Sequence, residues 1–289
     1  MGSKLGYCHS DWNYSIGSIC IHKGEEPVIS GLNGICNVFF TKCNLQCVYC
    51  QNHQISNNLQ TEVAYSLNLQ QVTNSICTIL SQGINMLGFV SPSHQITQVI
   101  AIIQAVKARG YQPIIVYNSN GYDKVESLQM LDGLIDVYLP DFKYSDNNLA
   151  KRFSGAANYV EVALKALKEM IRQKGPRLLV DPEGQAYSGI LIRHLVLPGY
   201  INNSIGVLEA IANELTLRVH ISLMAQYNPA FNTSDDKHLQ RKLQNNEYQL
   251  VIDKFDELGF EYGYIQALNS NDYYNPDFTA DHPFDSSQC

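Results

Sequence analysis

The stretch Cys43-Asn-Leu-Gln-Cys47-Val-Tyr-Cys50 places three cysteines on one short segment of the chain. Thiolates gathered this closely repel one another unless a metal neutralises them, so the segment indicates a metal site. A zinc ion would need a fourth ligand, and His53 has a suitable spacing from Cys50. An iron–sulfur cluster held by three cysteines would instead leave one iron open to a substrate or cofactor. The spacing favours the cluster and leaves zinc as the alternative.

Strand-like and helix-like segments alternate along the chain from residue 34 onward. Short apolar runs predict strands at 34–41, 84–90, 113–117, 134–139, 189–197 and 217–224, with a last short strand at 261–266. Apolar residues at helical spacing predict helices at 69–80, 95–109, 124–131, 160–170 and 203–215, and a mostly helical stretch at 237–258. This alternation predicts an α/β fold, a parallel sheet with helices outside. A complete doubly wound sheet and a partial (β/α)6 TIM-like barrel both fit it.

Polar side chains follow the predicted strands at the edge where both folds place their sites. Arg193 and His194 are successive strand residues, so one of them points into the barrel, and an inward arginine needs an anion. The convergence predicts a metal cluster beside a pocket for a polar, zwitterionic ligand. Each group also has a structural alternative: a helix cap, an ordinary turn or an ion pair. The candidate residues near strand ends are Ser91, Ser93, Asn118, Asp141, Lys143 and Arg193.

Composition narrows the class of protein. The net charge is −7 and the pI about 5.6, so we expect neither nucleic acid nor membrane as a partner. No apolar run reaches the roughly 18 residues of a membrane helix, and no signal peptide is visible. Because an exposed cluster needs reducing surroundings, the sequence predicts a cytoplasmic protein. We expect one domain, with residues 1–33 as an extension packed on a barrel of residues 34–289.

The cysteine motif resembles that of a known enzyme superfamily. Cys-x3-Cys-x2-Cys after a first strand, with Tyr49 just before the third cysteine, is similar to the radical S-adenosylmethionine superfamily. More narrowly, the chain resembles homologues of pyruvate formate-lyase activating enzyme, of a branch distinct from the true activase. The matching stretches are 22–27, 43–52, 116–122, 136–144, 193–199 and 224–229.

The resemblance implies a fold, two cofactors and a reaction. It implies a partial (β/α)6 barrel with a [4Fe–4S] cluster on Cys43, Cys47 and Cys50. S-adenosylmethionine would chelate the fourth iron, and its reductive cleavage would give methionine and a 5′-deoxyadenosyl radical that abstracts hydrogen from a substrate. An electron donor such as flavodoxin or ferredoxin is implied as a partner. The cofactor-binding residues carried over are Tyr49, Ser91, Ser93, Asn118, Asp141, Lys143 and Arg193, of which Lys143 and Arg193 would reach the carboxylate of S-adenosylmethionine or lie near it.

The chain also departs from the activases. Activases carry a Gly-Gly-Glu segment after the second strand, where this chain has Ser91-Pro-Ser93-His94, so the contact to the cofactor's amino group falls to the serines or their carbonyls. Asn118 stands where activases have an aspartate. Three further cysteines, Cys8, Cys20 and Cys36, would form a second metal site or serve as small buried residues.

Three functions remain open at this point. The first is a radical enzyme acting on a protein or peptide, as an activase makes a glycyl radical. The second is a radical enzyme acting on a small molecule. The third is a zinc-binding structural or regulatory module built on the three motif cysteines and His53.

Overall fold

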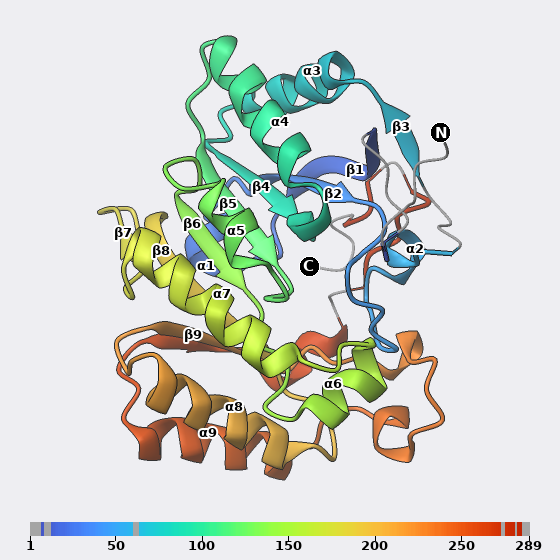
Figure 1. The fold of residues 1–289 in the computed structure, drawn as a ribbon, viewed down its shortest axis with the longest axis vertical. Coiled ribbons are helices and arrows are strands. Elements are labelled where there is room, and N and C mark those ends of the chain that lie inside the picture. The colour runs from blue at the N-terminus through green and yellow to red at the C-terminus, as the bar shows by residue number, and fades with distance from the viewer. Residues whose placement is uncertain (1–6, 9–12, 60–63, 273–274, 281, 285–289) are drawn as a thin grey trace.

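The computed structural model describes residues 7–8, 13–59, 64–272, 275–280 and 282–284. Cys289, Tyr273 and Tyr274 lie outside these ranges. A curved sheet forms the centre of the molecule, with strand order β10-β9-β8-β6-β5-β4-β2-β1-β3 (Figure 1). The strands are β1 (Tyr14–His22), β2 (Ile35–Phe40), β3 (Tyr65–Leu67), β4 (Met86–Val90), β5 (Ile114–Ser119), β6 (Val137–Pro140), β7 (Leu179–Val180), β8 (Ala186–Leu195), β9 (His220–Met224) and β10 (Gly263–Ile265).

The parallel part of the sheet decides between the two architectures left open by the sequence. Strands β2, β4, β5, β6, β8, β9 and β10 pair in parallel with their neighbours in chain order. A doubly wound sheet would reverse this order at a switch point, whereas a barrel winds in one direction. The predicted partial barrel is therefore confirmed, with β10 as an added parallel strand at one edge.

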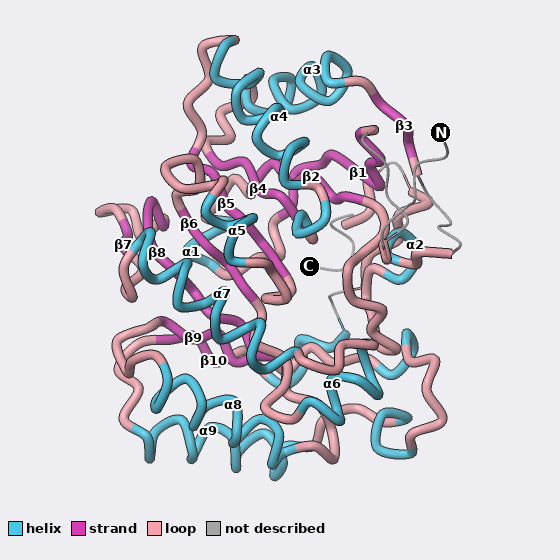
Figure 2. Tube along the Cα trace, in the orientation of Figure 1, coloured by secondary structure: helices cyan, strands magenta, loops and turns pink. Residues whose placement is uncertain are grey.

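Helices cover the outer side of the curved sheet (Figure 2). Apolar residues at helical spacing bury one stripe of each long helix against the strands, as in α3, where Val72, Ile76 and Leu80 are buried. Asn68 and Gln71 form the expected capping box at the start of α3. The helices are α1 (Pro27–Ser30), α2 (His53–Ser56), α3 (Leu69–Leu80), α4 (Ile96–Ala108), α5 (Val125–Gln129), α6 (Asn147–Ser154), α7 (Tyr159–Lys174), α8 (Ile201–Glu214) and α9 (Asn245–Leu258).

The inner face of the barrel has an apolar floor beneath a polar layer. Successive inward residues are two apart along a strand, so each floor residue is followed by a member of the layer above it. The floor packs against Val28 and Ile29 of α1, which closes that end of the barrel. Floor and layer residues follow one another as Ile35 and Asn37 on β2, Val116 and Asn118 on β5, Leu139 and Asp141 at β6, and Leu191 and Arg193 on β8. On β4 the residue above Met86 is Gly88, and the Asn37 side chain occupies the space that a side chain there would need.

The N-terminal extension contributes more than the sequence suggested. Residues 14–22 form β1, a strand that the sequence analysis did not expect, and β1 pairs antiparallel with both β2 and β3. Helix α6 was likewise not expected. Strand β5 runs two residues further than predicted, which makes Asn118 a strand residue rather than a turn residue.

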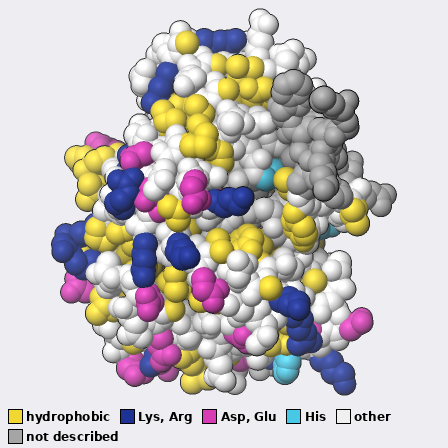
Figure 3. All heavy atoms as spheres, in the orientation of Figure 1, with side chains coloured by type: hydrophobic (Ala, Val, Ile, Leu, Met, Phe, Trp, Pro, Cys, Tyr) yellow, Lys and Arg dark blue, Asp and Glu magenta, His cyan; other side chains and the backbone are white. Residues whose placement is uncertain are grey.

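The surface carries charges of both signs. On the face shown in Figure 3, basic and acidic side chains are interspersed. Within the described ranges, the helices are too short or too polar to cross a membrane.

Candidate cluster and cofactor site

A cavity of about 570 Å³ opens at the carboxyl ends of the parallel strands. Cys43, Cys47 and Cys50 all line it, which places the three motif sulfurs beside one space. Its volume lies within the usual range of ligand pockets. Of the cofactor-binding residues predicted from sequence, those that line the cavity are Tyr49, Ser91, Asn118, Asp141, Lys143 and Arg193.

Ser93 is the predicted site residue that lies elsewhere. Ser93 does not line the cavity and lies near Asp123 instead. Burial raises the pKa of Asp123, and Ser93 opposes part of this shift. It does not cap α4 either, because the N-cap residue of α4 is Gln95. Ser91 does line the cavity, with a left-handed backbone (φ 53°, ψ 47°) that is rare for a serine.

Backbone hydrogen bonds hold the cysteine loop in place. The amide of Cys43 donates to Asn58 Oδ1 at 3.0 Å. The amides of Gln46 and Val48 donate to the carbonyls of Ser154 and Phe153, at 3.1 and 2.9 Å. Both acceptors belong to the last turn of α6, whose terminal carbonyls have no partner within the helix. The end of α6 therefore positions the loop.

Each motif thiol has a hydrogen-bond donor beside it. Asn120 Nδ2 lies 3.3 Å from Cys43 Sγ, Ser154 Oγ 3.0 Å from Cys47 Sγ, and Ser56 Oγ 3.3 Å from Cys50 Sγ. Donors of this kind stabilise thiolate ligands and tune a cluster's potential. The residues present therefore fit a thiolate-bound cluster.

Burial of the three sulfurs makes the metal-free thiols weak acids. Desolvation, followed by the charge of Cys47, raises the pKa of Cys43 to about 12. Desolvation also raises the pKa of Cys47 to about 11, and Lys143 opposes it in part. A metal centre that binds here must therefore displace the thiol protons and compensate the negative charges of three thiolates.

The zinc alternative has no support in the placement of the side chains. Among the described residues, no group of three or more His, Cys, Asp and Glu side chains is arranged to hold one ion. His53 is exposed, does not line the cavity, and packs its ring against Phe231 with centroids 5.3 Å apart. In a cluster each cysteine binds a different iron, so the sulfurs stand farther apart than the ligands of one ion. The described geometry favours the cluster.

Tyr49 takes part in a buried chain of hydroxyls that ends at the cluster motif. Its hydroxyl lies 2.5 Å from that of Tyr144, which in turn lies 2.6 Å from Ser154 Oγ. Ser154 donates to Cys47 Sγ. Burial raises the pKa of both tyrosines well above the ordinary value, so these groups stay neutral donors.

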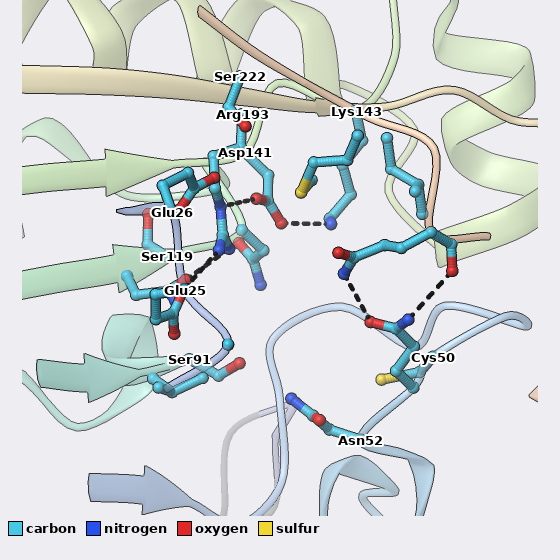
Figure 4. A pocket seen from close by; sticks show the side chains of 18 of the residues that line it. Glu25, Glu26, Cys50, Asn52, Ser91, Ser119, Asp141, Lys143, Arg193 and Ser222 are labelled. Carbon is cyan, nitrogen blue, oxygen red and sulfur yellow. Dashed lines mark hydrogen bonds and ion pairs between the residues drawn. The ribbon is translucent and has the colours of Figure 1, made fainter. Parts of the chain in front are cut away.

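The charged groups of the polar layer are already paired with one another (Figure 4). Arg193 Nε donates to Asp141 Oδ1 at 2.9 Å, Nη1 to Glu25 Oε2 at 3.2 Å, and Nη2 to Asn118 Oδ1 at 2.7 Å. Lys143 Nζ donates to Asp141 Oδ2 at 2.5 Å. Burial alone would lower the pKa of Lys143, but Asp141 and then Cys47 outweigh it and raise the pKa. Both cations are therefore charged at neutral pH.

Arg193 is the member of the Arg193–His194 pair that points into the barrel. His194 lies on the outer face of β8, fully buried, with Nδ1 2.7 Å from the Phe142 carbonyl and Nε2 2.8 Å from Ser204 Oγ. Burial lowers the pKa of His194 to about 4, so it is a neutral core residue.

Several residues of the site lie outside the set of cofactor-binding residues predicted from the sequence. Asn120 Nδ2 donates to Cys43 Sγ and to Asn44 Oδ1. Gln226 donates to Gln51 and accepts from Gln266, which links the residue after Cys50 to the residue after β10. Glu25 and Glu26 enter the cavity from the N-terminal extension. Asn120 and Gln226 come just after β5 and β9, so their position after predicted strands was the available signal. No strand pattern marks Glu25 and Glu26, because they come from a loop.

Comparisons with known proteins agree with this site. Residues 29–161 match the family described as a 4Fe-4S single cluster domain. The uncharacterized protein MJ0674 of Methanocaldococcus jannaschii is 26% identical over 258 residues, which cover 87% of this chain and 69% of that protein.

Solved structures share the fold at low identity. SuiB of Streptococcus suis, bound to S-adenosylmethionine, superposes with a TM-score of 0.51 at 10% identity over 78% of this chain and 48% of that one. A mutant of spore photoproduct lyase superposes with a TM-score of 0.52 at 11% identity, over 86% of this chain and 79% of that one. Both are radical S-adenosylmethionine enzymes. The chain has the radical S-adenosylmethionine fold. This likeness of fold agrees with the resemblance indicated by the cysteine motif. The chain spans about half the length of SuiB.

Proposed function

We propose that the protein is a radical S-adenosylmethionine enzyme whose cluster is held by Cys43, Cys47 and Cys50. One observation carries the proposal: the three thiols share one cavity with a paired set of carboxylates and cations. When bound, the cluster and S-adenosylmethionine would supply reductive cleavage of the sulfonium and a radical that abstracts hydrogen from a substrate.

The chain's own residues would hold and orient the cofactor. Lys143 is the better candidate for the carboxylate of S-adenosylmethionine, because an ammonium has three donors and the described contacts of Lys143 use one, to Asp141. Arg193 supports this arrangement by fixing Asp141. Ser91 lines the cavity and is our candidate to accept from the amino group through its hydroxyl or carbonyl. Tyr49 also lines the cavity.

The substrate class forms part of the same proposal. A peptide substrate is supported by the likeness to SuiB, which has been solved bound to the precursor peptide SuiA with a TM-score of 0.53. Activation of a glycyl-radical enzyme would be chemistry of the same class, and a small-molecule substrate is the alternative. A flavodoxin or ferredoxin would supply the electron, and the thiols require a reducing compartment such as the cytoplasm.

The test is product formation by anaerobically reconstituted protein. With S-adenosylmethionine and dithionite, the wild type should bind about four irons and four sulfides and release 5′-deoxyadenosine and methionine. Protein that takes up one zinc, and loses it in His53→Ala, would overturn the proposal in favour of the zinc module.

A further inference from the structure

The segment His22-Lys-Gly-Glu-Glu-Pro27 brings two adjacent glutamates to the cavity in opposite surroundings. Glu25 is fully engaged: its Oε1 accepts from Asn37 at 3.0 Å and Asn118 at 3.2 Å, and its Oε2 pairs with Arg193 at 3.2 Å. His22 Nδ1 lies 3.4 Å from Oε1. Glu25 is therefore a structural member of the polar layer.

Glu26 has fewer direct contacts, although the charge of Arg193 also acts on it. Its Oε2 is buried and accepts no hydrogen bond from the described residues, and no ion pair joins Glu26 to a described cation. Its carbonyl accepts from the amides of Ile29 and Ser30 at 2.7 and 3.0 Å, so α1 fixes its backbone. An unpaired buried carboxylate costs stability, and such an oxygen is expected to have a partner that the chain does not supply.

Specific neighbouring residues shape the surroundings of the two glutamates. Asn37 reaches Glu25 across Gly88, where a Cβ would lie 2.0 Å from Asn37 Oδ1, so only glycine leaves the space. Ser222 and Tyr264 line the cavity in the neighbourhood of Glu26. Figure 4 shows Glu25 and Glu26 on the opposite side of the pocket from Cys50 and Asn52. Glu26 is therefore separated from the wall that would hold the cluster.

We propose that the Glu26 end of the cavity is a substrate subsite that binds a cationic amino group. The inference rests on the proposed function and deepens it by naming a substrate class. Asp141 and Glu25 each form an ion pair with Arg193, and Asp141 also pairs with Lys143. Arg193 acts on Glu26 through its charge alone, so Glu26 Oε2 still lacks a donor in contact with it. A free amine or a lysine side chain of a peptide supplies that charge together with N–H donors. Glu26 and the three motif cysteines line the same cavity, so an amine bound at Glu26 would share that cavity with the cluster.

Titration calorimetry of cluster-loaded protein with S-adenosylmethionine present tests the subsite. The probes are n-butylamine, the neutral n-butanol, and the peptide acetyl-Gly-Lys-Gly-amide. The wild type should bind n-butylamine at least about tenfold more tightly than n-butanol, because only the amine can form a charge-assisted hydrogen bond with Glu26. Glu26→Gln should abolish this preference, and the exposed Glu183→Gln should retain it. Tighter binding of the peptide than of n-butylamine would identify a side chain as the source of the amine, and weaker binding would identify a small molecule.

The outcomes separate this inference from the proposed function. A wild type that binds S-adenosylmethionine but does not prefer the amine, or a Glu26→Gln variant that keeps the preference, overturns the subsite alone. Loss of S-adenosylmethionine affinity in Glu26→Gln would assign Glu26 to the cofactor and also overturn it. Failure of the wild type to load a cluster would instead overturn the proposed function.

Discussion

Arg193 and Asp141 form a buried ion pair, with Nε and Oδ1 2.9 Å apart and side chains 14% and 11% exposed. The same carboxylate pairs through Oδ2 with Lys143. Asp141 therefore joins the two cations that the resemblance assigns to the carboxylate of S-adenosylmethionine, but in different ways. The guanidinium of Arg193 is also bonded to Glu25 and Asn118, whereas Lys143 keeps donors for a ligand.

This difference predicts separate effects of removing the two cations. Arg193→Ala leaves Asp141 and Glu25 short of a partner, and breaking a buried pair in this way typically costs about 3–5 kcal/mol. Its main effect should be a lower melting temperature. Lys143→Ala should keep the cluster but bind S-adenosylmethionine about 10- to 150-fold more weakly, the loss of one charge-assisted hydrogen bond. Calorimetric titration and thermal unfolding of both cluster-loaded variants measure the two effects.

The reverse pattern would contradict this assignment. If Arg193→Ala kept its melting temperature and lost cofactor affinity, Arg193 rather than Lys143 would grip the carboxylate. Unchanged affinity in both variants would remove the cofactor role from this part of the polar layer.

The motif cysteines should behave alike. Cys43→Ala, Cys47→Ala or Cys50→Ala should each abolish the brown [4Fe–4S] absorption, because two thiolates cannot hold the cluster. Cys77→Ala is the matched control, since Cys77 is buried between α3 and the sheet, away from the cavity. Iron and sulfide analysis after anaerobic reconstitution measures the result. A variant lacking one motif cysteine that still holds a full cluster would remove that residue from the ligand set.

Much of the barrel could be predicted because its strands and helices are marked by local patterns. Helix α3 matches the predicted range 69–80, since its apolar spacing and its capping pair lie within the segment itself. Strand β1 was not predicted from the sequence, although the structure buries three of its residues, Ile16, Cys20 and His22. Its identity as a strand depends on pairing with β2 and β3, which is a long-range property.

Some residues of the candidate site could be predicted from local sequence, and others depend on contacts between distant segments. The cysteines and the strand-end residues were found because the fold brings strand ends together wherever they lie in the sequence. Glu25 and Glu26 were not assigned a role, because their loop precedes the barrel and enters it from the extension. Whether Arg193 faces a ligand or an internal carboxylate likewise depends on Glu25, which is 168 residues away in the sequence.

Acid should destabilise the protein through His194. Burial lowers its folded-state pKa to about 4 from 6.5, so folding favours the neutral ring. The resulting stability is present above pH 6.5 and is lost as the pH falls through 4, a change of up to about 3 kcal/mol. His194→Asn should reduce the pH dependence of the unfolding free energy in this window, and the exposed His282→Asn should leave it unchanged. Denaturant unfolding at several pH values gives the slopes; equal slopes in wild type and His194→Asn would show that another group titrates.

The adjacent glutamates should respond oppositely to neutralisation. Burial raises the pKa of Glu25, but His22, Arg193 and Asn37 outweigh it and lower the pKa to about 2. Its stabilisation is therefore present above pH 4.5 and lost toward pH 2. Burial, reinforced by Glu25 and opposed by Arg193, raises the pKa of Glu26 instead. A raised pKa means that stability is full below pH 4.5 and falls as the pH rises through the folded-state value.

At pH 8 the two isosteric variants should therefore shift stability in opposite directions. Glu25→Gln should lose about 1.5–3 kcal/mol, the contribution of a charged hydrogen bond, because Arg193 loses an anion. Glu26→Gln should be as stable as the wild type or more so, and this difference should shrink toward pH 4.5 because both forms are then neutral. Denaturant unfolding of both variants at pH 8 and pH 4.5 measures the four values. A Glu26→Gln variant as destabilised as Glu25→Gln at pH 8 would mean that Glu26 already has an internal cation as partner, and the need for an external amine would disappear.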